Sequence, residues 1–287
     1  MSRLLVVLAL TFAIQSHAQE RLGGLIPTGN SKKGNLFVTW GYNRAYYNRS
    51  DIHYKGEGFD FTLFDVAAED MPEKFGKVYF DPTQFTVPQF NFRLGYYIKD
   101  NTALSLGWDH MKYHIIQTQV VGIDGYIDAE KYIAPNYTGT FNNTYMLYDP
   151  GFMDYHHSDG FNFIRLAIEQ RIPFYESANK KHVLAMNASA SVGAMLPWTD
   201  FTFLGEHHRN KLHLAGYGAS VHAGFRYEFF NYFFLQATAQ VGWANLTDIM
   251  LEDHLPSRAK QQITFIERSW ALGGYIPVKK QKQPSVE

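Results

Sequence analysis

The stretch FNFRLGYYI (residues 90–98) is followed by a short turn, KDN (99–101), and by a second stretch, TALSLGWD (102–109). Apolar and polar residues alternate in both stretches, and in a β-strand such residues point to opposite faces. One of these faces is large and aromatic, whereas the other is rich in Gly and charge. We therefore interpret the pair as a hairpin with its apolar face toward lipid and its polar face toward a narrow lumen.

The same alternation recurs in eight stretches between Leu36 and Ile276. It predicts an all-β fold, an eight-stranded antiparallel up-and-down transmembrane β-barrel. The connections are alternately long and short, as expected where tight turns lie in the periplasm and longer loops outside. Two long extracellular loops are expected, at 48–88 and 116–160. The predicted strands are 35–47, 90–98, 102–115, 161–174, 182–199, 214–229, 232–244 and 262–276.

The two ends of the chain predict its compartment. Residues 1–18 have the features of a secretory signal peptide: a positive start, an apolar run from Leu4 to Ile14, and small residues up to Ala18. We expect a periplasmic lead at 19–34, the barrel at 35–277 and a periplasmic tail at 278–287. Because the chain has no Cys, neither a lipid anchor, a disulfide nor a thiolate metal site is expected. The predicted location is the bacterial outer membrane.

Composition excludes other classes of protein. Charged residues make up 18% of the chain and aromatic residues 16%, and the formal net charge is −1. This balance argues against a nucleic-acid partner. No segment after the signal peptide offers the ~20 apolar residues that a membrane helix needs. Length leaves room for one barrel with its loops, and no cofactor is expected.

The tryptophans offer a second check on the two faces. All five occupy positions that the alternation assigns to the lipid side. Aromatic side chains of this kind gather at membrane interfaces. We therefore predict a lipid-interface girdle made of Trp40, Trp108, Trp198, Trp243 and Trp270.

The predicted lumen carries charge of both signs. An eight-stranded barrel has an interior just wide enough for side chains to fill, and unpaired buried charge is costly. We therefore predict an ion-pair network that plugs the lumen, with Arg93 and Asp109 roughly opposite each other across the first hairpin. A narrow channel for small solutes is the alternative. The network residues are Arg93, Asp109, Arg165, Glu169, Arg171, Arg226, Glu228 and Glu267.

With these alternating strands, tight turns, inward Arg and Glu, and outward Trp, the chain resembles the small outer-membrane barrels of the OmpA, OmpX and OmpW kind. It is most similar to uncharacterised outer-membrane barrel proteins of Bacteroidota. The resemblance covers residues 35–276 as architecture. It implies anchoring, adhesion, lipid or small-molecule handling, or service as a subunit of a larger complex. Unlike barrels of the OmpA kind, the chain is not expected to have a C-terminal peptidoglycan-binding domain.

Some barrels of this architecture modify lipid A, so an acyl hydrolase is the main alternative to a non-enzymatic role. Ser220, His222 and Glu228 share one face of a predicted strand and supply the residue types of acyl transfer. Neighbours two apart in a strand lie ~7 Å apart, however, too far for a direct hydrogen bond. Their side chains also point into the lumen, away from an acyl ester in lipid. We expect no enzymatic activity.

The predicted loops hold two further candidates. Asp154, His156, His157 and Asp159 could bind a divalent cation at the outer rim, although a solvated loop explains them as well. The alternating stretch 54–66 could form a β-ribbon above the membrane that binds a protein or a glycan, or it could pack against the second loop as a cap. The expected partners are outer-membrane lipid, lipopolysaccharide and other outer-membrane proteins.

Overall fold

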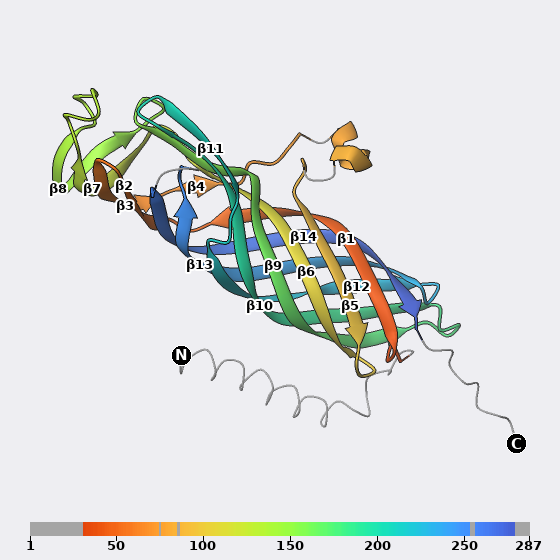
Figure 1. The fold of residues 1–287 in the computed structure, drawn as a ribbon. Helices are drawn as coiled ribbons and strands as arrows, with labels where there is room; N and C mark the ends of the chain where they lie inside the picture. The colour runs from red at the N-terminus through yellow and green to blue at the C-terminus, as the bar shows by residue number, and fades with distance from the viewer. Residues whose placement is uncertain (1–30, 75, 85–86, 253–255, 279–287) are drawn as a thin grey trace, which may run out of the picture.

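The computed structural model describes residues 31–74, 76–84, 87–252 and 256–278. The predicted signal peptide, residues 19–30 of the lead and residues 279–287 of the tail lie outside the described residues. Eight strands form the barrel (Figure 1). They are β1 (Asn35–Tyr47), β5 (Phe90–Tyr97), β6 (Thr102–Ile115), β9 (Met153–Glu176), β10 (His182–Phe203), β12 (Gly216–Phe229), β13 (Phe233–Met250) and β14 (Arg258–Pro277).

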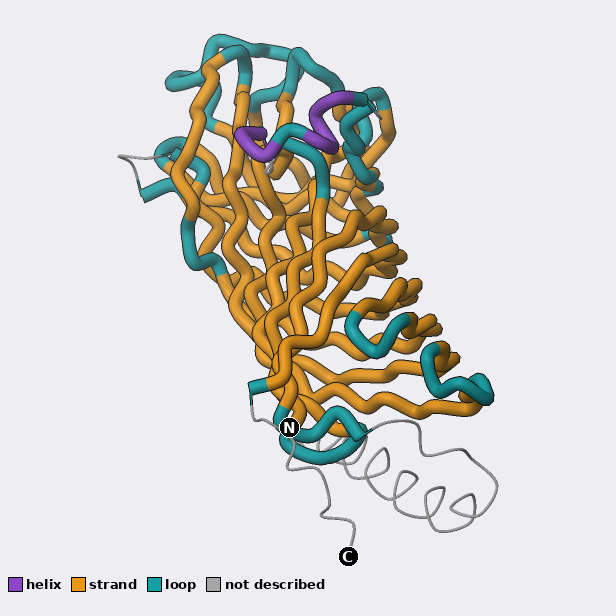
Figure 2. Tube along the Cα trace, turned by 90° about the vertical axis from the view of Figure 1, so that its right-hand side faces the viewer, coloured by secondary structure: helices purple, strands orange, loops and turns teal. Residues whose placement is uncertain are grey.

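These eight strands close into a ring. The pairing order is β1-β5-β6-β9-β10-β12-β13-β14, every pair is antiparallel, and β14 pairs again with β1. The shear of the barrel can be measured by passing from each residue to its partner on the next strand, starting at Trp40 on β1. Through β14, β13 and β12 this path reaches Leu184 on β10, whereas through β5, β6 and β9 it reaches Ala194, so the two paths end ten residues apart on the same strand. Such a stagger requires strongly tilted strands, which Figure 2 shows. The predicted fold class is confirmed.

The ring presents apolar side chains outward and polar ones inward. On β9, Leu166 is 65% exposed whereas its neighbour Arg165 is buried; on β12, Phe225 is 63% exposed and Arg226 is buried. A protein in water does not leave so continuous an apolar surface uncovered. The exterior is suited to lipid, and this is the arrangement of an outer-membrane β-barrel.

Beyond the ring, the chain builds an extracellular cap. The two long segments expected as loops, 48–88 and 116–160, both contain strands. Their alternating apolar residues bury one face in a shared core above the barrel, with Tyr54, Phe61, Ile123 and Tyr155 fully covered. The cap strands are β2 (Ser50–Gly56), β3 (Phe59–Val66), β4 (Ala68–Glu69), β7 (Gln119–Ile127), β8 (Gly139–Tyr148) and β11 (Glu206–Leu212).

The cap continues the barrel sheet. Strand β2 pairs with the outer end of β14, and β3, β7 and β8 follow in order. Strands β9 and β10 rise from the ring into the cap without a break, which extends them beyond the predicted limits at Phe161 and Thr199. The predicted β-ribbon at 54–66 is a hairpin, β2–β3, that turns at Gly58, where φ is +82°.

One segment leaves the wall sideways. Residues 70–89, between β4 and β5, form a lateral excursion that holds two short 3-10 helices, η1 (Lys77–Phe80) and η2 (Pro82–Gln84). In Figure 1 this segment lies beside the ring rather than over its mouth. Within the described ranges, no helix is long and apolar enough to cross a membrane.

Candidate functional site

The middle of the lumen is organised around Asp109. Its Oδ1 accepts hydrogen bonds from Arg93 Nη1 at 2.5 Å and from Asn91 Nδ2 at 2.8 Å, and its Oδ2 accepts one from Arg165 Nε at 2.7 Å. Asn91 also donates to Glu267 Oε1 at 2.5 Å. One carboxylate therefore lies between two buried guanidiniums, across strands β6, β5 and β9.

A second cluster closes the periplasmic end around Glu228. Its oxygens accept hydrogen bonds from Arg171 Nε at 2.5 Å and Nη2 at 2.9 Å, and from the hydroxyl of Tyr275 at 2.8 Å. From the segment before β1, Lys32 reaches in with its Nζ 3.4 Å from Glu228 Oε2 and 4.2 Å from the centre of the Tyr275 ring. The buried rings of Phe37, Tyr97, Phe234 and Tyr275 pack together at this end.

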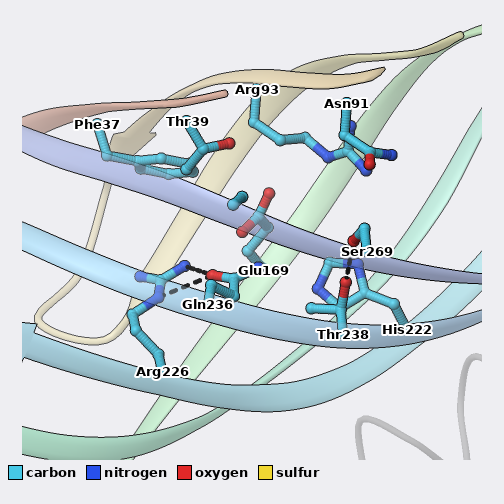
Figure 3. Close-up of a pocket in the computed structure, with 11 residues that line it drawn as sticks. Phe37, Thr39, Asn91, Arg93, Glu169, His222, Arg226, Gln236, Thr238 and Ser269 are labelled. Atoms are coloured by element: carbon cyan, nitrogen blue, oxygen red, sulfur yellow. Dashed lines mark hydrogen bonds between the residues drawn. The ribbon is translucent and has the colours of Figure 1, made fainter. Parts of the chain in front are cut away.

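The remaining predicted network residues bind neutral groups. Arg226 donates to Gln236 Oε1 at 2.6 and 2.9 Å, as Figure 3 shows, and its guanidinium lies 4.1 Å from the centre of the Phe234 ring. Glu169 accepts from Ser105 Oγ at 2.6 Å. Between them the lumen leaves a cavity of about 10 Å³, room for one water molecule. Five of the eight predicted network residues therefore form two ion-paired clusters. The other three, Arg226, Glu169 and Glu267, are hydrogen-bonded to uncharged side chains.

Beyond this polar middle, the outer lumen is filled by apolar side chains. Met111, Phe163, Met195 and Phe265 are all buried there and belong to the same core as the cap. Along the described part of the lumen, aromatic, charged and apolar layers therefore follow one another from the periplasmic to the outer end.

The three candidate catalytic residues share one face of β12 but do not contact each other in any described hydrogen bond. Ser220 Oγ bonds to Ser191 Oγ at 2.7 Å, and Glu228 pairs with Arg171. His222 Nδ1 lies 2.9 Å from Ser189 Oγ, a partner on β10 that the sequence did not suggest. All of these groups are inside the barrel, on the side away from lipid.

Residues 153–160 are strand and not loop, so the candidate metal ligands divide between two faces. Asp154 and His156 stay together, with Asp154 Oδ2 3.9 Å from His156 Nε2, and His157 lies on the opposite face. Asp154 and His156 face outward, where Asp154 Oδ1 lies 3.1 Å from His114 Nε2 and this contact holds the pKa of Asp154 below its ordinary value. His157 faces the cap core, and Asp159 pairs with Arg209 at 2.5 Å. Among the residues that the structure describes, no group of three or more His, Asp or Glu side chains is placed to hold a metal ion.

The interior of the cap holds His157 in an apolar setting. Its ring stacks on Phe161 with centroids 5.6 Å apart and meets the ring of Tyr155 at 5.0 Å. The side chain is fully covered. Because burial disfavours the charged imidazole, the pKa of His157 is lowered to about 3.

All five tryptophans lie at outward positions of the wall, and the lipid-interface girdle stays a prediction. Trp40 stacks on Phe90 at 4.6 Å, and Trp108 meets the same ring at 4.9 Å. The other three lie elsewhere on the wall: Trp243 beside Tyr217, Trp198 near Arg209, and Trp270 at 70% exposure.

The outermost strand of the cap, β8, is largely exposed. Strand β8 ends the pairing order, with β7 on one side and no strand of the described chain on the other. It carries no charged residue and no Pro. Tyr145 is 79% exposed and Leu147 is 46% exposed, and Leu147 pairs with Val120, which is 64% exposed. The tip of the cap therefore presents an uncharged strand edge beside an apolar patch.

Sequence reasoning missed several of these groups. Lys32 was placed in a polar lead, although its spacing from β1 brings it under the barrel, where the Lys32 amide donates to Asp100 O at 3.1 Å. The hydroxyls of Tyr97 and Tyr275 both accept from Arg226. Their inward positions in the alternation were the available signal.

No family model and no curated protein matches the chain. Several solved structures are similar to it. The outer-membrane protein AlkL, solved in lipid bilayers, is 10% identical over 88% of this chain and 95% of that one, with a TM-score of 0.42. OprG from Pseudomonas aeruginosa is 10% identical over 87% and 98%, with a TM-score of 0.36. Ail of Yersinia pestis, the attachment invasion locus protein, is 11% identical over 85% and 98%, with a TM-score of 0.29. These similarities concern the fold alone, and the resemblance to Bacteroidota barrels stays a prediction.

Proposed function

We propose that this protein is a non-enzymatic binding component of the bacterial outer membrane, with a barrel that anchors it and a cap that binds a protein partner. The free edge of β8 carries the proposal. An exposed strand edge displays unpaired backbone N–H and C=O groups, and an extended segment of another protein can add to it as a further strand.

The chemistry of β8 favours such strand addition. Natural edges are usually protected by Lys, Pro or a bulge. Here a bulge opposite Asp124 places Asn143 at a φ of +45°, and its amide donates to the Asp124 side chain at 3.0 Å. The run from Thr144 to Tyr148 beyond this bulge is regular and unprotected. The exposed side chains of Tyr145 and Leu147 would select a partner segment with apolar residues at alternate positions.

The filled lumen supports an anchoring role for the barrel. Two ion-paired clusters and an aromatic layer occupy the interior that a channel would need open. The groups suited to acyl transfer are engaged with other partners inside the barrel. Both observations favour binding over transport and over catalysis.

Proline substitutions at neighbouring positions test the strand edge. In a strand, successive amides point to opposite edges. Of the two substitutions Thr144→Pro and Tyr145→Pro, one therefore removes a donor to β7 and the other removes a donor on the free edge. The migration of outer-membrane complexes on native gels would be compared between the two variants and with Asn136→Pro, in the preceding turn.

We expect the variant that lacks the free-edge donor to lose the complex while its barrel stays folded, and Asn136→Pro to keep the complex. A photo-crosslinker at Tyr145 should capture the partner, and one at Lys55, on the β2–β3 hairpin, should not. A complex that survives both proline substitutions would exclude strand addition at β8.

A further inference from the structure

The lateral excursion is fastened to the outside of the barrel. The Tyr42 hydroxyl donates to the Tyr79 carbonyl at 2.5 Å, and their rings meet edge to face at 4.9 Å. Arg44 Nη2 donates to the Tyr79 hydroxyl at 3.0 Å. Tyr42 and Arg44 belong to the outward set of β1, so the excursion folds back onto the wall that faces lipid.

A groove lies between the excursion and this wall. It encloses about 480 Å³ and is lined mainly by aromatic and apolar side chains: Trp40, Tyr42, Val78, Tyr79, Phe80, Asp81 and Pro88. Phe80 is 76% exposed and continues the apolar lining outward. Because Trp40 and Tyr42 belong to the lipid-facing wall, the groove opens toward the hydrocarbon of the outer leaflet. An acyl chain matches its lining.

Two arginines face each other just above the groove. Arg44 on β1 and Arg268 on β14 are direct cross-strand partners, and both point outward. Like charges in this position destabilise a sheet unless an anion lies between them. Neither guanidinium has a carboxylate within 4 Å among the described residues. Arg44 donates to uncharged oxygens, and Arg268 lies 5.4 Å from the centre of the Tyr46 ring.

Two acids of the excursion, Asp70 and Asp81, are engaged by other donors. Asp70 accepts from the Ala45 amide at 3.2 Å and from the Gln89 side chain. Asp81 accepts from both the amide and the hydroxyl of Thr83, at 2.9 and 2.7 Å. No described carboxylate therefore forms an ion pair with either guanidinium, and the donors that Arg44 and Arg268 have left over can bind the oxygens of a phosphate.

We infer that Arg44, Arg268 and the groove together bind one phosphate-bearing lipid of the outer leaflet, the lipid A part of lipopolysaccharide. The guanidiniums hold a phosphate at the membrane surface, and the groove takes one of the acyl chains below it. This site lies on the barrel wall, away from β8, and does not depend on the function proposed for the cap.

Native mass spectrometry of the full-length protein in micelles tests this site, with lipid A titrated as the probe. We expect one lipid A to bind, and Arg44→Gln/Arg268→Gln to weaken it at least about tenfold, since each lost charged hydrogen bond is costly. A matched control, Lys55→Gln/Arg209→Gln, removes two cap charges and should change affinity less than about twofold. Val78→Trp, which fills the groove, should weaken binding while both arginines remain.

Three outcomes would overturn the inference. The first is unchanged affinity in the double arginine variant, provided that its heat-dependent gel migration shows a folded barrel. The second is equal binding of lipid A from which both phosphates have been removed. The third is binding of phosphatidylglycerol as tight as that of lipid A, which would exclude lipid A as the specific occupant.

Discussion

Arg165 donates its Nε to the Oδ2 of Asp109 at 2.7 Å, and both side chains are fully buried. Because Arg93 shares the same carboxylate, Asp109→Asn would leave two buried guanidiniums without their direct carboxylate partner. We expect it to lower the free energy of unfolding by about 3–5 kcal/mol. Urea titration in micelles, followed by the gel migration of the folded barrel, measures this change.

Asp65→Asn is the matched control. It breaks the pair between Arg49 and Asp65, whose side chains are 53% and 74% exposed. Exposed pairs contribute only about 0–1 kcal/mol. If Asp109→Asn cost no more than Asp65→Asn, the two-guanidinium arrangement would not be a stabilising element of the lumen.

Two adjacent glycines should respond differently to Ala. A Cβ at Gly273 would come 2.3 Å from the Phe234 ring inside the lumen, whereas at Gly274, on the outer face, the nearest atom would be 3.5 Å away. We expect Gly273→Ala to destabilise the barrel by about 1–3 kcal/mol through overpacking, and Gly274→Ala to be tolerated. Thermal unfolding of both variants checks this, and equal midpoints would contradict it.

The cap should lose stability in acid. His157 has a pKa of about 3 in the fold, below its unfolded value of ~6.5. The unfolded state therefore binds the proton more readily, so stability is retained above pH ~6.5. It falls by up to about 1.4 kcal/mol per pH unit between pH ~6.5 and ~3. Hydrogen exchange of cap peptides across this range measures the slope.

His157→Phe should flatten that pH dependence, because Phe keeps the stacking on Phe161 and cannot take up a proton. His207→Gln, at an exposed position, should leave the slope as it is. A slope that persists in His157→Phe would assign the acid sensitivity to another group.

The filled lumen predicts that the barrel does not conduct. Planar bilayers with the purified protein should show no steady openings, and Arg93→Ala or Glu169→Ala should not create them, because the aromatic layer at Phe37 and Tyr275 remains. Regular openings in the wild-type protein that disappear on replacing Arg93 or Glu169 would restore the channel alternative.

The acyl hydrolase alternative has a direct assay. Lipid A incubated with the purified protein should keep all of its acyl chains, because Ser220 bonds to Ser191 and His222 to Ser189, within the lumen. Release of fatty acid by the wild-type protein, abolished in both Ser220→Ala and His222→Ala, would contradict a non-enzymatic role.

The barrel strands were largely predictable, because one face of each strand meets lipid and the other meets a polar lumen, which imposes an alternation of apolar and polar residues. The period of two predicted the bounds of β1 at Asn35 and Tyr47 and a turn beginning at Lys99, within two residues of the end of β5 at Tyr97. The strands of the cap were less predictable, because lipid accounts for the alternation of the barrel strands only and not for that of strands outside the membrane. Phe59, Phe61 and Leu63 alternate just as the barrel strands do, but their buried face meets other protein, and a single sequence does not show which strands lie opposite.

The partners within the lumen were predictable only in part. Arg93 and Asp109 lie on neighbouring strands of one hairpin, so their approach follows from the turn between them. Arg226 and Tyr97 are far apart in the sequence, and their contact at 2.8 Å depends on ring closure and on the stagger of the strands. Lys32 precedes the first strand, where no alternation indicates a direction.

Strands β9 and β10 have 24 and 22 residues, although about 9–11 tilted residues suffice to cross a bilayer. The surplus of about a dozen residues, at ~3.3 Å each and inclined by 35–45°, raises the wall roughly 30 Å above the membrane. Both strands continue into the cap, with one shift of register between Pro197 and Asp200, so the cap is built on the barrel wall and not on a tether. Contacts made at its tip occur at a fixed height above the cell surface, within reach of molecules that the surrounding sugar chains would hold away from the bilayer.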